Sequence, residues 1–123
     1  MFEKITRYIE PVEKGKFSGE YVSPFRVDYS PTAENLMDAV YEYVETYTHA
    51  ALTQYNDILR NANIERDDRY NTDVTNRNAE TVLALLIASA RQEKYCTGAW
   101  LEAYTSGALL GWMYRLKELD EMD

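Results

Sequence analysis

The sequence predicts a mainly α-helical domain with five to six helices packed in a compact antiparallel arrangement, with a minor N-terminal β-hairpin as an addition. Two observations favour this fold: apolar residues recur at helical spacing from residue 31 onward, and residues 79–104 form one long helix-favouring stretch. Long helices joined by short turns are typical of antiparallel neighbours. The chain has 123 residues, enough to bury one core, so we expect a single domain over residues 1–123.

The N-terminal quarter combines a short helix with an extended segment. Apolar residues at near-helical spacing predict an amphipathic helix over residues 2–13, limited by Pro11, whose ring is not tolerated in a helix interior. Residues 20–29 are expected to be extended, because Phe25, Val27 and Tyr29 alternate with polar residues at the period of a strand. Because an isolated two-stranded hairpin is marginally stable, we expect any hairpin here to lie against helices.

The clearest predicted helix begins at Ser30-Pro31, where serine can cap free amides and proline fits the first helical position. One half of this helix is apolar and the other half is acidic. We expect the acidic stripe to face solvent, and the alternative is a docking face for a basic partner. The stripe consists of Glu34, Asp38, Glu42 and Glu45.

The second half of the chain alternates helices and loops. Apolar spacing predicts a helix over 52–62, starting near Leu52, and the polar residues 61–78 predict a long loop with at most one helical turn. We expect Asn76 or Asn78 to cap a helix over 79–104 that kinks at Gly98. Ser106-Gly107 should end it and start a last helix over 108–118.

The composition excludes several classes of protein. The net charge is −8, and residues 30–59 hold acids but no Lys or Arg, so we expect no direct binding of nucleic acid. The longest apolar run, 82–88, is too short for a membrane span, and the N-terminus lacks an apolar signal core. A single cysteine fits a reducing compartment, so we expect a cytoplasmic protein.

The residues offer little catalytic chemistry. One His and one Cys cannot form a zinc set, and Glu45 with His49 lacks the second Glu–His pair of a di-iron bundle. An EF-hand starting at Asp67 fails, because it lacks the required Gly and Glu. Cys96 is the one candidate nucleophile, but a lone Cys on an apolar helix face is typically buried and inert. We therefore expect no metal, no cofactor and no catalytic residue, and we favour a protein without enzymatic activity.

The polar segment around Arg91 is the strongest candidate site. Arg91 and Glu93 are two residues apart, so on a helix they cannot face each other, and each needs a partner elsewhere. In one interpretation they form structural ion pairs between helices, and Arg91→Ala and Glu93→Ala would both lower stability. In the other they line a ligand pocket with Tyr95 and Trp100.

The C-terminal half carries a recognisable pattern, formed by Arg91–Tyr95, Gly98, Ser106–Gly107, Leu109–Leu110 and Arg115–Leu119. This pattern resembles that of a family of small bacterial proteins described only as a domain of unknown function. The family tends to Arg and Phe where this chain has Lys94 and Tyr95. The resemblance implies a bacterial or prophage origin and implies no activity.

The last helix has an unusually wide apolar arc. At about 100° per residue its apolar side chains spread over roughly 220°, and Leu110 and Tyr114 fall away from the face of Leu109 and Leu116. Either two other elements of the same chain flank this helix, or its second face meets another molecule. We expect a homodimer through this helix.

Two functions follow from these observations. The first is an interaction or regulatory module with a protein partner, since the chain shows no catalytic constellation and no cofactor motif. The second is a small-ligand binder or enzyme with a pocket around Arg91, Glu93, Tyr95 and Trp100. A deep pocket at those residues would favour the second function, and side chains paired within the chain would favour the first.

Overall fold

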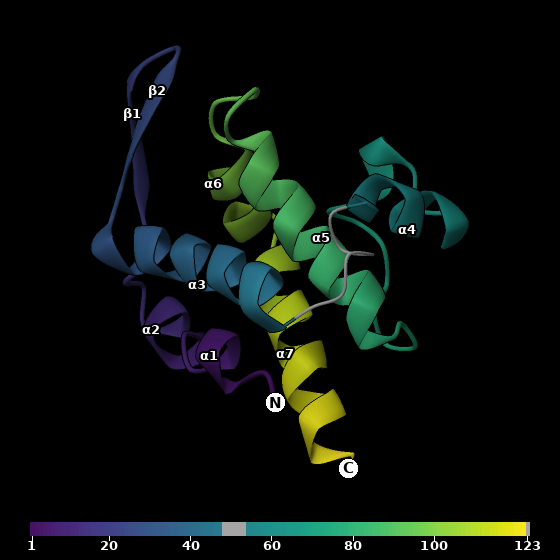
Figure 1. Ribbon diagram of the computed structural model, residues 1–123. Coiled ribbons are helices and arrows are strands. Elements are labelled where there is room, and N and C mark those ends of the chain that lie inside the picture. The colour runs from purple at the N-terminus through teal and green to yellow at the C-terminus, as the bar shows by residue number, and fades with distance from the viewer. Residues whose placement is uncertain (48–53, 123) are drawn as a thin grey trace.

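The computed structural model describes residues 1–47 and 54–122 and shows a mainly helical protein with one small antiparallel sheet (Figure 1). The predicted fold class is confirmed. The elements in chain order are α1 (Glu3–Thr6), α2 (Ile9–Glu13), β1 (Gly19–Ser23), β2 (Arg26–Tyr29), α3 (Pro31–Tyr47), α4 (Tyr55–Asn61), the short 3-10 helix η2 (Arg66–Asp68), α5 (Ala79–Gln92), α6 (Ala99–Thr105) and α7 (Ala108–Glu121).

Helix α5 lies at the centre of the molecule and packs against α3, α4, α6 and α7 (Figure 1). All ten residues from Thr81 to Ala90 are buried, because this helix is apolar on every side. Asn78 starts it by accepting a 2.8 Å hydrogen bond from the backbone N–H of Thr81, which confirms one of the two predicted caps. Buried side chains from α1 to α7 join the same hydrophobic cluster around α5.

Helix α7 is flanked by other elements of its own chain. It contacts α1 and α2 as well as α5 and α6. Leu109 and Leu116 are buried, and Leu110 is partly buried against the same core. Other elements of the same chain therefore flank the wide apolar arc of this helix, which was the first of the two explanations.

The predicted helix over residues 2–13 is two short helices, α1 and α2, that break at Arg7 and Tyr8. Pro11 lies in the first turn of α2. The backbone N–H that proline lacks would have no acceptor within the helix at this position, so nothing is lost. The Pro11 ring would clash with the carbonyl of Arg7, four residues earlier, if one helix continued through this point. Pro11 therefore fits near the start of a second helix, which begins at Ile9.

Helix α3 begins as predicted. The Ser30 Oγ accepts a 3.3 Å hydrogen bond from the N–H of Ala33 and donates a 2.7 Å hydrogen bond to the carbonyl of Lys16. One hydroxyl thus caps α3 and holds the loop that precedes β1. The predicted helix over 52–62 corresponds to α4, although Leu52 and also His49 lie outside the described residues.

The hairpin β1–β2 is present, with Gly19 paired to Tyr29 and Tyr21 to Val27. It extends beyond the helices, and its β2 end leads directly into α3 (Figure 1). The predicted long helix over 79–104 is instead interrupted between α5 and α6. Gly98 has a φ of +94°, a left-handed conformation that favours glycine, so the chain turns here instead of kinking.

Candidate functional site

Residues 93–98 connect α5 to α6, and Glu93 holds this turn together. The Glu93 Oε1 accepts hydrogen bonds from the Tyr29 hydroxyl, at 2.6 Å, and from the N–H of Trp100, at 2.9 Å. Its Oε2 accepts from the N–H of Gly98 at 2.9 Å. The carboxylate therefore caps the first turn of α6, where backbone N–H groups have no helical partner.

Tyr29 completes this arrangement from the hairpin. Its hydroxyl oxygen accepts a 3.0 Å hydrogen bond from the N–H of Leu101 while its proton goes to Glu93. Burial, reinforced by the hydrogen bond to Glu93, raises the pKa of Tyr29 well above its usual range. The phenol thus stays protonated and donates to the carboxylate at physiological pH.

Trp100 anchors α6 to the start of α3. Its side chain is fully buried, and its Nε1 donates a 3.0 Å hydrogen bond to the carbonyl of Ala33. Its ring lies 6.1 Å from that of Phe17, centroid to centroid. The ring of Trp100 thus packs against apolar residues, and its N–H has a hydrogen-bond acceptor within the chain.

Arg91 and Tyr95 point elsewhere. The Arg91 guanidinium is exposed and lies 5.8 Å from the centre of the Tyr55 ring, and Tyr95 is 85% exposed. The four residues that we considered for a pocket are therefore not gathered in one cavity. Glu93 receives its hydrogen bonds from neutral donors instead of the cation that we expected as its partner.

The acidic stripe of α3 is exposed, as predicted for all four carboxylates. Part of it borders an open groove of about 410 Å³ between α3 and the end of α5. Within the described ranges no ion pair shorter than 4.0 Å joins these acids to Arg91 or Lys94. The residues that line the groove are Asp38, Tyr41, Glu42, Glu45, Arg91 and Lys94.

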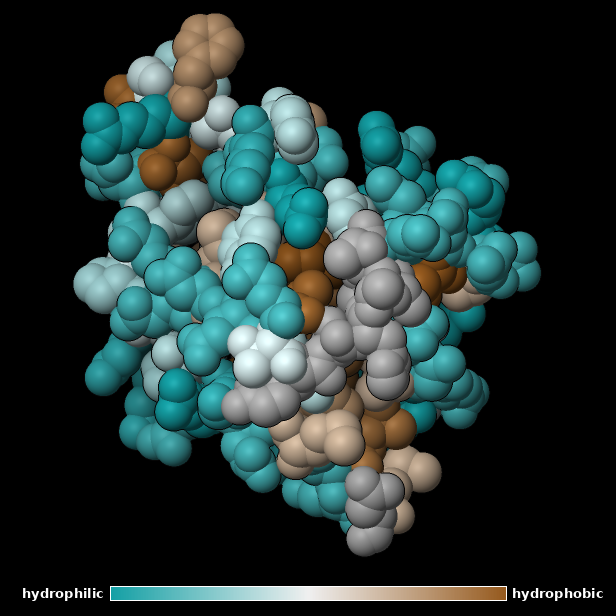
Figure 2. Space-filling model, viewed as in Figure 1, coloured by the Kyte–Doolittle hydropathy of each residue, from teal (hydrophilic) through white to brown (hydrophobic). Residues whose placement is uncertain are grey.

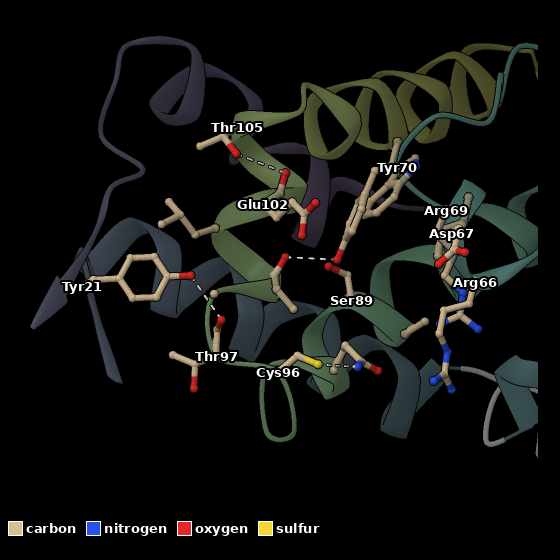
Figure 3. Close-up of a pocket in the computed structure, with 17 residues that line it drawn as sticks. Tyr21, Arg66, Asp67, Arg69, Tyr70, Ser89, Cys96, Thr97, Glu102 and Thr105 are labelled. Carbon is tan, nitrogen blue, oxygen red and sulfur yellow. Dashed lines mark hydrogen bonds between the residues drawn. The ribbon is translucent and has the colours of Figure 1, made fainter. Parts of the chain in front are cut away.

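A different cavity, with a volume of about 620 Å³, lies between α5, α6 and the segment around η2 (Figure 3). We call it the Arg69 cavity. Tyr70 donates a 3.2 Å hydrogen bond across it to the carbonyl of Ala99. Its wall includes Arg66, Arg69, Tyr70, Ser89, Gln92 and Trp112.

Two polar atoms of this cavity lack hydrogen-bond partners in the part of the chain that is described: the Ser89 Oγ and the Arg69 Nε, both buried. Burial raises the pKa of Tyr70, and the neighbouring Ser89 hydroxyl partly offsets this rise, although the Ser89 Oγ has no hydrogen-bond partner among the described residues. Buried polar atoms without partners are uncommon in folded proteins, so these two mark the cavity as a candidate binding site.

Cys96 also borders this cavity, and here the sequence interpretation was wrong. The residue is exposed instead of buried, because it belongs to the turn between α5 and α6 and not to an apolar helix face. Its Sγ accepts a 3.1 Å hydrogen bond from the Gln92 Nε2.

Comparison with known proteins identifies the chain at the level of a family. A family of unknown function (DUF6508) matches residues 2–122. The chain belongs to this family. No curated protein and no solved structure matches the chain. The match covers nearly the whole chain, and the family carries no assigned activity.

The Arg69 cavity was not predicted from the sequence. Arg66, Arg69 and Tyr70 lie in the polar loop 61–78, whose four acidic and three basic residues nearly balance, so its net charge does not mark it as a binding site. A long polar loop with little secondary structure is itself a signal, because such loops in compact domains are often functional.

No described helix has the length and apolar character needed to cross a membrane.

Proposed function

We propose that this protein is a non-enzymatic interaction module that contacts a partner protein through its hairpin and the turn before α6. One observation carries the proposal. Phe25 and Tyr95 are the two most exposed large hydrophobic side chains of the described residues, at 87% and 85%. Tyr21 and Val22 on β1 are also exposed. Exposed apolar side chains that gather in one region favour a protein-interaction site, and aromatic residues are enriched at such sites.

We call Tyr21, Val22, Phe25 and Tyr95 the hairpin surface. Hydrophobic atoms are visible at the tip of the hairpin in Figure 2. Two hydrogen bonds fix the hairpin to the turn that carries Tyr95: the Tyr21 hydroxyl donates to the carbonyl of Thr97 at 3.2 Å, and the Thr97 Oγ1 donates to the carbonyl of Phe25 at 3.1 Å. A surface that is already held in place loses less conformational entropy on binding.

The acidic stripe, Glu34, Asp38, Glu42 and Glu45, extends this proposal. All four carboxylates are exposed, and Asp38, Glu42 and Glu45 border a groove whose other side carries Arg91 and Lys94. A partner with basic side chains would find complementary charge on the acidic side. The same negative charge supports a protein partner over a nucleic acid. We place the interaction in a bacterial cytoplasm, which is consistent with the single cysteine and with the resemblance of the C-terminal pattern.

We also propose a homodimer through α7, a surface separate from the hairpin surface. Tyr114 on α7 is 43% exposed, whereas Leu110 is partly buried against the core, so Tyr114 is the better residue for testing a dimer through α7. Sedimentation velocity at micromolar concentration should show a dimer that Tyr114→Glu weakens. A wild-type protein that sediments as a monomer at high concentration would contradict the dimer.

A small-ligand binder is the second candidate function. The observation that favours it is the Arg69 cavity with its two unpartnered buried polar atoms. Of the segment first considered, Arg91, Glu93, Tyr95 and Trp100, none lines this cavity, although their neighbours Gln92 and Cys96 do. An enzymatic role at this position has no further support from the residues.

Site-specific photo-crosslinking in the native cell tests the interaction proposal. A benzophenone side chain is placed at position 25 and, as a control, at the exposed position Asn61 on α4, far from the hairpin (Figure 1). We expect a discrete crosslinked product at position 25 that is absent at position 61 and weakened by Tyr95→Ser. No product at position 25, or the same products at both positions, would contradict the proposal.

A further inference from the structure

We propose that the Arg69 cavity binds a small organic molecule that carries an oxyanion, a carboxylate or a phosphate, on an apolar body. This inference rests on the second candidate function, the small-ligand binder, and does not depend on an interaction through the hairpin surface. It rests on the size of the cavity, on an uncompensated pair of guanidinium groups at one side, on an unpartnered hydroxyl, and on aromatic and aliphatic walls.

The cavity has the dimensions of a ligand site. Its volume of about 620 Å³ lies within the range of roughly 300–1,000 Å³ that small-molecule pockets occupy. Elements far apart in sequence enclose it: η2 and the following residues supply one side, α5 and α6 supply the floor, and Tyr21 of β1 borders the far side (Figure 3). A site built from several elements of the fold holds its lining groups in fixed positions.

Arg66 and Arg69 both line this cavity, and in the described chain neither has a carboxylate within ion-pair distance. Arg69 donates from its Nη2 to the Asn56 Oδ1 at 3.0 Å, a neutral partner, and its Nε is buried without a partner in the described residues. Burial lowers the pKa of Arg69, and the positive charge of Arg66 lowers it further. An oxyanion here would compensate the charges of both arginines and accept a hydrogen bond from the Arg69 Nε–H. Guanidinium groups favour carboxylate and phosphate oxygens as such acceptors.

The carboxylates that border the same cavity leave these arginines unpaired. Asp67 and Glu102 both lie on its wall and are exposed. Among the described residues, neither forms an ion pair shorter than 4.0 Å with Arg66 or Arg69. Water therefore solvates these two carboxylates, and the guanidinium side remains available to a ligand.

Ser89 supplies the second polar anchor. The residue is only 4% exposed, and its Oγ lacks a hydrogen-bond partner in the described chain. Figure 3 shows its side chain meeting that of Tyr70 in the middle of the cavity, and the Tyr70 proton is already donated to Ala99. The Ser89 hydroxyl is thus free to form a hydrogen bond with a polar group of a ligand. That bond would offset the free-energy cost of burying the hydroxyl without a partner.

The remaining walls select an organic ligand over an inorganic ion. Leu85, Leu101 and Trp112 line the cavity, and the Tyr70 and Trp112 rings stack with 6.1 Å between centroids. Apolar and aromatic walls with a few polar groups are typical of sites for small organic molecules. An aromatic or aliphatic body would cover these walls while its oxyanion reaches the arginines.

The test compares four probes by isothermal titration calorimetry and by amide chemical-shift changes: benzoate, phenyl phosphate, the neutral benzamide and inorganic phosphate. We expect benzoate or phenyl phosphate to bind at the residues of the cavity, and the stronger of the two identifies the oxyanion as a carboxylate or a phosphate. Benzamide and inorganic phosphate should bind about tenfold more weakly or not at all, since each lacks one of the two required features.

Matched variants locate the site. Arg69→Gln should weaken binding of the preferred probe about tenfold or more, and Ser89→Ala should weaken it without lowering the melting temperature. Arg60→Gln is the control, because Arg60 is an exposed neighbour that pairs with Asp57 and does not line this cavity. The proposal is overturned if none of the four probes binds, if benzamide binds as well as benzoate, if inorganic phosphate binds as well as phenyl phosphate, or if Arg60→Gln and Arg69→Gln have equal effects.

Discussion

The Tyr29 hydroxyl donates a 2.6 Å hydrogen bond to the Glu93 carboxylate, which joins the last residue of β2 to the turn that follows α5. The two residues are 64 positions apart in sequence. Together they provide acceptors for the N–H groups of Gly98, Trp100 and Leu101. The hairpin surface and the start of α6 are thus held by one small polar junction.

Glu93→Ala should lower the free energy of unfolding by about 2–3 kcal/mol, because it leaves the Tyr29 hydroxyl and two backbone N–H groups without their acceptor. Arg91→Ala should cost less than about 1 kcal/mol, since the exposed guanidinium lies over the Tyr55 ring and forms no ion pair with any described carboxylate. Urea denaturation of both variants measures the difference. Equal losses would contradict this division and restore the simpler prediction that both residues act through ion pairs.

The stability of the protein should fall as the pH rises above about 10. A free tyrosine loses its proton near pH 10, whereas the raised pKa of Tyr29 keeps the proton on the folded state. Above pH 10 the folded state therefore binds more protons than the unfolded state, and the free energy of unfolding decreases. Tyr41 and Tyr70 shift in the same direction through burial, so Tyr29 accounts for part of the effect.

Tyr29→Phe should make this decrease shallower. Denaturation curves from pH 8 to 11 for the wild type and for Tyr29→Phe measure the two slopes. If the slopes are the same, Tyr29 does not titrate differently in the folded and unfolded states.

Gly98→Ala and Gly107→Ala separate backbone strain from a side-chain collision. Both glycines have positive φ, +94° and +86°, and each precedes a helix. A Cβ on Gly98 would collide with the Tyr21 hydroxyl, whereas a Cβ on Gly107 would meet nothing within 4 Å. Each variant should lose about 1 kcal/mol from strain, and Gly98→Ala should lose more.

The excess loss in Gly98→Ala should disappear when Tyr21→Ala is the background, because the collision partner is then removed. Thermal unfolding of the single and double variants gives the comparison. An unchanged excess in that background would show that Tyr21 is not the obstacle.

Cys96 should react with a thiol reagent in the native protein, because it is exposed and lies in a turn. Reaction with 5,5′-dithiobis(2-nitrobenzoate) should modify one thiol per chain without denaturant. A thiol that reacts only after unfolding would support the buried residue that the sequence suggested.

The pattern of apolar residues predicted the helical elements well, because helical spacing over many residues is a strong signal. Ser30 and Asn78 capped α3 and α5 as expected, since a cap depends on local chemistry alone. The break at Arg7 and the turn between α5 and α6 were missed. The second of these depends on contacts from Tyr21 and Tyr29, distant residues that a local pattern cannot indicate.

The candidate site was harder to predict for the same reason. Spacing showed that Arg91 and Glu93 needed separate partners, but not that the partners of Glu93 would be neutral donors. Arg69 and Ser89 come from different elements, and only the folded chain brings them to one cavity.

A double-mutant cycle between Tyr29→Phe and Glu93→Gln tests the central claim most directly, namely that the segment after Arg91 is a structural junction with the hairpin. Each single variant removes the donor or the charged acceptor of the 2.6 Å hydrogen bond. We predict a coupling energy of about 1–2 kcal/mol in urea denaturation, somewhat less than a whole hydrogen bond to a charged group, because the amide oxygen of Glu93→Gln can still accept. Additive losses, with coupling below about 0.5 kcal/mol, would contradict the claim.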